Sequence, residues 1–168
     1  MADKYDSKED TLAHIKRVKT ILIMMISALN ERMKSHDQSK LCDPEKATFD
    51  EVTGNLKGLT YGSEEYHEQL KEMAPALKHH YEHNQHHFEH FENGMKGMNI
   101  VDLVEMFCDW AAATERHEDG NIHSSIEHNS GRFGYEETLK EIFHNTANFY
   151  RVGKANDSKT YKDLKEVN

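Results

Sequence analysis

Apolar residues recur at steps of three and four positions along much of this chain, and this spacing constrains its fold more than any other feature. The first such segment is Leu12, Ile15, Val18, Leu22, Met25, Leu29 and Met33. Side chains at this spacing share one face of an α-helix. The 168 residues include only nine glycines and two prolines, too few turn-forming residues for a strand-and-turn fold. We therefore predict an all-α protein.

The remaining chain divides into further helices by the same reasoning. One begins after Asp43-Pro44, because a capping residue followed by proline is typical of a helix start, and it ends near residue 52. Others are predicted from residue 63, over 75–91, over 100–116 and over 135–150. Segments 54–62 and 118–134 are polar and contain glycine, so we predict loops there, with at most one helical turn over 124–128. The result is a helical bundle of about six to eight helices in one domain, 1–168, with its core over about 11–150 and a polar tail over 153–168.

The composition excludes several classes of protein. A formal net charge of -9 repels phosphate backbones, so stable nucleic-acid binding is not expected. The apolar run Ile21–Ile26 is far too short for a membrane span or a signal peptide core. Cys42 and Cys108 lie far apart and are predicted to be free thiols. We expect a cytoplasmic protein, in the host cytoplasm if the chain comes from a phage. Aromatic residues that fit either a core or a homo-oligomer interface are Phe88, Phe91, Trp110 and Phe133.

Histidine is the unusual component. The chain has thirteen, and six of them lie between His79 and His90. On a helix, His80, Asn84 and His87 lie along one stripe, because steps of three and four return to the same face. A solvated polar face is the alternative interpretation. Imidazole nitrogen is a common ligand for zinc, copper, iron and nickel, so this density predicts that some of these residues bind a metal.

Other candidate ligands lie elsewhere in the chain. His14 shares the apolar face of the first helix and is predicted to point inward, either as a hydrogen-bonded core histidine or as a ligand. The adjacent His36-Asp37 can offer an imidazole nitrogen and a carboxylate oxygen to one ion. Asp109 lies among apolar residues of its helix, and a partly buried carboxylate requires a cation or a donor. An ion pair with Arg116 or Lys16 would also satisfy it.

Taken in chain order, these residues resemble the pattern of the HD-domain superfamily of metal-dependent phosphohydrolases. The run 36–40, His-Asp-Gln-Ser-Lys, is similar to the doublet-plus-lysine motif of the branch that cleaves cyclic dinucleotides. His86-His87 is similar to that branch's paired histidines, and segment 107–114 to its aspartate-bearing helix. The resemblance covers about residues 11–117. No Gly-Tyr-Pro element follows the paired histidines, so it does not extend to specificity for cyclic di-GMP.

More narrowly, the chain resembles an uncharacterised family of small phage and bacterial proteins. These share the patterns His-Asp-x-Ser-Lys, His-Tyr-x-x-Asn-x-His-His and Glu-Met-x-x-Asp-Trp, all of which occur here. That narrower resemblance names no substrate.

The resemblance to HD-domain proteins implies an HD-domain-like bundle and a particular set of ligands. In the family's chemistry, the residues that would hold the first metal are His14, His36, Asp37 and Asp109. Asp37 would bridge to a second ion held by His80 and by His86 or His87. Water acidified by the metal attacks phosphorus, with Lys40 binding a phosphate oxygen, so Asp37 and Lys40 are the predicted catalytic residues.

Supporting roles and alternatives complete the hypothesis. Arg132 is a candidate second phosphate contact, and Asn84 and Glu105 are candidates to hold the ligand histidines in place. The cofactor is one or two divalent ions, with manganese, iron, cobalt, nickel and zinc not distinguished. The predicted substrate is a nucleotide or another small phosphoester. One alternative is a helical bundle that binds iron for oxygen or redox chemistry, although an adjacent His-Asp doublet is not the hemerythrin pattern. Another is a sensor or inhibitor that binds a nucleotide or a metal without turnover.

Overall fold

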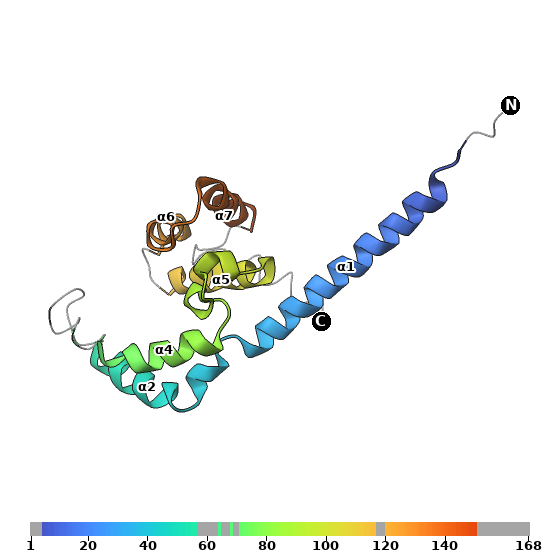
Figure 1. Cartoon of the computed structure of the whole chain (residues 1–168). Helices are drawn as coiled ribbons and strands as arrows, with labels where there is room; N and C mark the ends of the chain where they lie inside the picture. The colour runs from blue at the N-terminus through green and yellow to red at the C-terminus, as the bar shows by residue number, and fades with distance from the viewer. Residues whose placement is uncertain (1–4, 57–63, 65–67, 69–70, 117–119, 151–168) are drawn as a thin grey trace. The chain divides into compact units, whose positions relative to one another are not determined.

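The structure, a computed structural model, describes residues 5–56, 64, 68, 71–116 and 120–150. Its elements are helices, and no strand occurs among the described residues (Figure 1), which confirms the all-α prediction. The α-helices are α1 (Lys8–Ser35), α2 (Glu45–Leu56), α4 (Ala74–His83), α5 (Ile100–Thr114), α6 (Ile122–Phe133) and α7 (Glu137–Tyr150). Three short 3-10 helices are η1 (Gln38–Leu41), η2 (Phe88–His90) and η3 (Gly94–Gly97). The chain divides into two compact units, residues 1–38 and 39–168.

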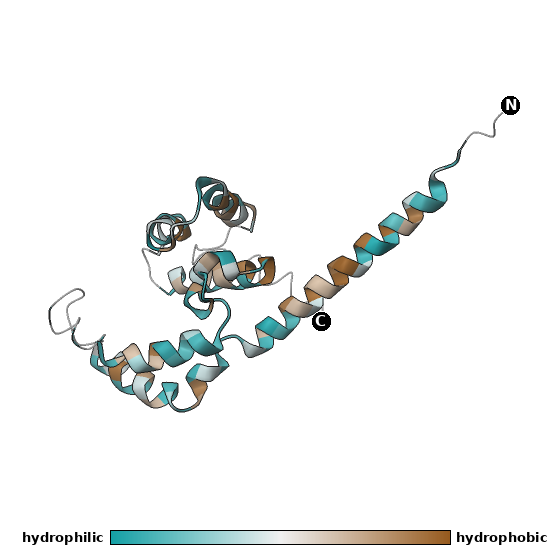
Figure 2. Ribbon diagram, in the orientation of Figure 1, coloured by the Kyte–Doolittle hydropathy of each residue, from teal (hydrophilic) through white to brown (hydrophobic). Residues whose placement is uncertain are grey.

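The first unit consists mainly of α1, which confirms the helix predicted over 12–33. It runs without a break from Lys8 to Ser35 and buries none of its residues. Its middle, Ile21–Ile26, is apolar on every face (Figure 2). No helix in the described part of the chain is both long enough and apolar enough to cross a membrane.

The second unit has its hydrophobic core around α5. This helix begins with a capping box, in which the Asn99 side chain accepts hydrogen bonds from backbone N–H groups and the Asp102 carboxylate accepts one from the Asn99 backbone N–H. Helix α6 packs against both α5 and α7. The buried residues of this core are Met106, Phe107, Trp110, Ala111, Ile122, Ile126, Tyr135, Phe143 and Ala147. Trp110 is therefore a core residue.

Helix α6 corrects the prediction that 118–134 is mostly loop. The Asn121 side chain accepts hydrogen bonds from the backbone N–H groups of His123 and Ser124, which begins the helix. Ile122 and Ile126, one turn apart, are buried in the core. Gly134 adopts the left-handed conformation, with φ of 66°, and ends it. A polar helix that buries few apolar side chains gives a weak periodic signal, which is why it was missed.

Helix α4 corrects a second prediction, the helix over 75–91. It ends at His83, and Asn84 adopts an extended backbone conformation with φ of -126° and ψ of 109°. The Asn84 side-chain amide donates to the carbonyl of His80, which satisfies a carbonyl in the last turn. His80 and His87 therefore do not share a helical stripe. The predicted helix from residue 63 falls largely outside the described residues, and the polar tail over 153–168 does so entirely.

Candidate metal centre

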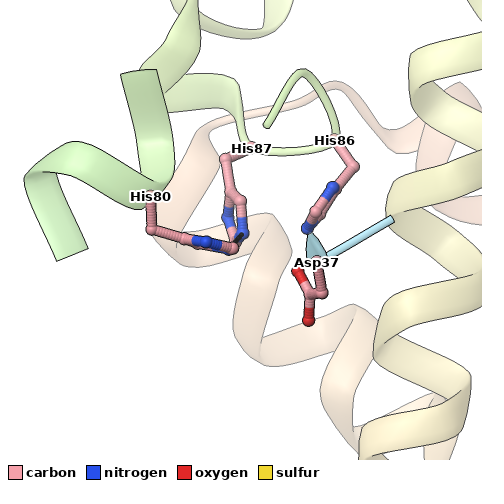
Figure 3. A group of neighbouring side chains, drawn as sticks. All are labelled: Asp37, His80, His86 and His87. Carbon is pink, nitrogen blue, oxygen red and sulfur yellow. Dashed lines mark hydrogen bonds between the residues drawn. The ribbon is translucent and has the colours of Figure 1, made fainter. Parts of the chain in front are cut away.

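Three histidines of the second unit meet at the turn that follows α4. One nitrogen from each of His80, His86 and His87 lies within 4.8 Å of the other two. The Nε2 atoms of His80 and His87 are 3.0 Å apart, and the rings of His86 and His87 have centroids 4.2 Å apart. Figure 3 shows these rings turned toward one another; it also draws Asp37, which belongs to the first unit. The end of α4 is what makes this possible, because the chain reverses after Asn84 and returns His86 and His87 toward the helix.

Glu45 lies behind His80 and is buried. It is the first residue of α2, and its side chain is 0% exposed. One carboxylate oxygen is 2.9 Å from His80 Nδ1, and the other is 2.7 Å from His79 Nδ1. Burial alone would raise the pKa of Glu45, but the hydrogen bonds from His79, Ser39 and His80 outweigh it and hold that pKa below its usual value. The site thus contains a buried carboxylate that remains ionised at neutral pH.

Ser39 and Asn84 complete the surroundings of His80. The Ser39 hydroxyl donates to Glu45 over 3.1 Å and accepts from the Asn84 amide over 2.8 Å. Asn84 therefore lies beside His80, as its predicted supporting role requires. Ser39 is the fourth residue of the run His-Asp-Gln-Ser-Lys and fixes the start of the second unit to this centre.

Helix α5 brings a second carboxylate to the cluster. Glu105 Oε1 is 3.3 Å from His86 Nδ1, and both side chains are buried. Asp109, one turn further along α5, is half-buried, as predicted. Burial, together with the charges of Glu105 and Asp109, raises the pKa of the Cys108 thiol. The carboxylate of Glu105 beside the buried His86 imidazole favours a cation.

A comparison with protein-family models identifies the family of the chain. The model of the family of unknown function DUF5662 matches residues 3–151. The chain belongs to DUF5662. No curated protein and no solved structure matches it. The DUF5662 match spans both units, including the C-terminal helices α6 and α7.

The two predicted phosphate contacts have different surroundings. Lys40 lies in η1, with Nζ 5.6 Å from the centre of the Phe49 ring, and that ring meets His80 edge-on at 6.3 Å. Lys40 and His80 therefore share the Phe49 ring as a neighbour. Arg132 lies in the last turn of α6 instead of a loop, and its guanidinium donates to Glu89 over 2.8 Å. This ion pair ties α6 to η2, the element directly after His87.

Two predicted ligand groups belong to the first unit. His36 and Asp37 follow the end of α1, with His36 Nε2 3.7 Å from Asp37 Oδ2 and with Asp37 at a positive φ of 56°. His14 is exposed on α1. Twenty-one positions of unbroken helix separate it from Ser35, which corresponds to about 32 Å. The structure therefore keeps His14 apart from the doublet, and the two cannot ligate one ion, which corrects that ligand set.

Sequence reasoning missed Glu45 and His79. In the sequence, Glu45 is one of many acidic residues in the first turn of a helix, a position that the helix dipole favours. It precedes His79 by 34 positions, and no motif spacing joins them. The available signal was a glutamate at a helix start soon after a His-Asp doublet, which is too common to single out a residue.

The arrangement of donors fits a divalent transition metal. Zinc binds imidazole nitrogen at about 2.0–2.1 Å, so two ligands of one ion lie about 3–4 Å apart. The 3.0 Å between His80 and His87 is in this range, and it equally suits one N–H···N hydrogen bond in metal-free protein. The carboxylates of Glu45 and Glu105 stand behind His80 and His86, as is usual for metal-binding histidines. Magnesium and calcium prefer oxygen ligands and fit this set poorly.

Proposed function

We propose that this DUF5662 protein is a metal-dependent hydrolase of phosphoesters, with a nucleotide or another small phosphorylated compound as its substrate. The observation that carries the proposal is the convergence of His80, His86 and His87, with a buried carboxylate beside two of them. In this proposal the protein acts in the cytoplasm. A divalent ion bound there would supply Lewis acidity, which acidifies water and offsets charge on a phosphoryl group.

The chain's own residues have distinct tasks in this mechanism. His80, His86 and His87 would hold the ion, and Glu45 and Glu105 would orient the rings of His80 and His86. Lys40, which shares the Phe49 ring with His80, would bind a phosphate oxygen as a point charge.

Asp37 is proposed as the carboxylate ligand because it is close in the chain to a residue of the centre. Ser39, two positions later, is hydrogen-bonded within the centre. Consecutive Cα atoms are about 3.8 Å apart, so the Asp37 Cα lies within about 7.6 Å of the Ser39 Cα. His36 is one residue further away.

The decisive experiment measures bound metal and phosphate release together. Purified protein is assayed for metal content and then, with added manganese or zinc, for hydrolysis of bis(p-nitrophenyl) phosphate and a panel of nucleotides. His86→Ala and Asp37→Ala are expected to lose activity by at least 100-fold. The matched control is His83→Ala, an exposed histidine of α4. Equal hydrolysis by wild type and His86→Ala would contradict the proposal.

The second candidate function is oxygen or redox chemistry at iron. Its supporting observation is the same set of imidazoles with carboxylates, which also suits non-haem iron. Protein purified with iron, coloured by its absorption and inactive on every phosphoester, would favour this function over hydrolysis.

A further inference from the structure

Glu45 uses both of its carboxylate oxygens on consecutive histidines of α4. The Oε2 atom is 2.9 Å from His80 Nδ1, and the Oε1 atom is 2.7 Å from His79 Nδ1. Its side chain is 0% exposed, and that of His80 is 1% exposed. A buried carboxylate held by two rings and a hydroxyl fixes the orientation of what it contacts far better than a surface residue does.

The chemistry of the carboxylate dictates which His80 nitrogen carries the proton. Glu45 Oε2 accepts a hydrogen bond from the Ser39 hydroxyl over 3.1 Å and lies 2.9 Å from His80 Nδ1, and an accepting carboxylate oxygen pairs with an N–H, so His80 Nδ1 is assigned as the donor toward Glu45. In a neutral imidazole the other nitrogen, Nε2, then carries the lone pair. That Nε2 atom faces His87 Nε2 at 3.0 Å, inside the histidine cluster. Glu45 therefore presents His80 to the cluster in the form that a metal ion binds.

The neighbouring groups support the same tautomer. The Asn84 amide lies 3.0 Å from His80 Nδ1, but its hydrogens are directed to Ser39 Oγ and the His80 carbonyl. Because both amide hydrogens are used at these contacts, none is left to donate to His80 Nδ1, so that nitrogen can carry its own proton. Glu45 is thus the acceptor that selects the tautomer.

From this geometry we infer that Glu45 is a positioning residue of the metal centre, which sets the tautomer and orientation of His80 for an ion. The inference rests on the proposed metal-binding function. It goes further in assigning His80 Nε2 as the ligand atom and Glu45 as the group that determines it. Carboxylates in this position typically change metal affinity by about 10–100-fold when they are substituted.

The test compares the zinc affinity of the full chain with that of two carboxylate-to-amide variants. Affinity is measured by competition with a chromophoric chelator, and urea unfolding checks that each variant folds. Glu45→Gln is expected to bind zinc about 10–100-fold more weakly, because one amide oxygen replaces two acceptors. Asp50→Asn is the matched control on α2, where the Asp50 side chain is 66% exposed, and its affinity is expected to equal that of wild type.

A second measurement separates positioning from simple structural support. In the wild-type protein, ¹⁵N NMR of the imidazole rings is expected to show His80 protonated at Nδ1, and Glu45→Gln is expected to lose that preference. Unchanged zinc affinity in Glu45→Gln would overturn the inference and leave the metal centre standing. A wild-type His80 protonated at Nε2 would overturn it even if Glu45→Gln failed to fold. A wild type that binds no zinc would overturn the metal centre itself and Glu45's role with it.

Discussion

Substitution of Phe143 by alanine is expected to destabilise the second unit strongly, although this residue lies beyond the segment that resembles HD-domain proteins. Its side chain is 4% exposed. The ring lies 5.8 Å from that of Phe107, 5.5 Å from that of Trp110 and 5.6 Å from that of Tyr135, between centroids. Buried Phe→Ala substitutions cost about 3–5 kcal/mol, and three aromatic neighbours place this one in the upper half of that range. The helix α7 is therefore part of the core.

The assay is urea unfolding followed by the fluorescence of Trp110, the single tryptophan of the chain. With a slope of about 2 kcal/mol per molar urea, the unfolding midpoint is expected to fall by roughly 2 M. Phe149→Ala is the matched control, because Phe149 lies on the same helix with 79% of its surface exposed, and a change within about 0.5 kcal/mol is expected. A loss below about 1 kcal/mol for Phe143→Ala would refute the placement of α7 in the core.

Three further predictions concern backbone fit, pH and metal binding. A Cβ at Gly97 would lie 2.7 Å from Phe91 Cβ, so Gly97→Ala is expected to lower the free energy of unfolding by about 1–3 kcal/mol in urea titrations. Gly54→Ala in α2 is the contrasting variant, because a Cβ at Gly54 would have nothing within 4 Å, and it should raise the free energy of unfolding by up to about 1 kcal/mol. Burial raises the pKa of Tyr135 from 10.0 to about 12, so the folded state holds the phenolic proton more tightly than the unfolded state. The free energy of unfolding should therefore decline from pH 10 toward 12 in wild type, and it should decline less in Tyr135→Phe. A free zinc concentration of 100 times the Kd should stabilise wild type by up to about 2.7 kcal/mol in calorimetry and His86→Ala by much less. Equal stabilisation of the two proteins would place the zinc ion elsewhere.

Periodicity predicted the helices that carry many apolar residues at helical steps and missed α6, which carries few. Helices α1, α5 and α7 carry many apolar residues at helical steps, and the structure confirms all three. Helix α6 has few apolar residues in a polar sequence, so its spacing resembled that of a loop. Its signals were local, in the Asn121 cap and the glycine after Phe133. Capping residues locate such a helix better than hydrophobic spacing does.

In the candidate centre, too, the sequence predicted features that are local in the chain and missed contacts between residues far apart in it. The density of histidine in residues 79–90 predicted metal ligands there, and three of these histidines do converge. The sequence placed them on one helix, whereas the chain reverses after Asn84, and a helical stripe could not have brought His86 into the cluster. The contact of Glu45 with the histidines depends on the packing of α2 against α4, which the residue spacing within either helix does not predict.

The unbroken α1 changes which ligands a metal centre in this protein can have. In the pattern of HD-domain proteins, a histidine from the first helix and the His-Asp doublet share one ion. Here about 32 Å of helix separates His14 from Ser35, so these two groups cannot meet at one ion while α1 remains continuous. Two carboxylates of the second unit already contact histidines, since Glu45 lies within hydrogen-bond distance of His79 and His80, and Glu105 stands 3.3 Å from His86. In the proposed hydrolase the doublet would then contribute without His14, through Asp37, which the chain connects to Ser39 over two residues.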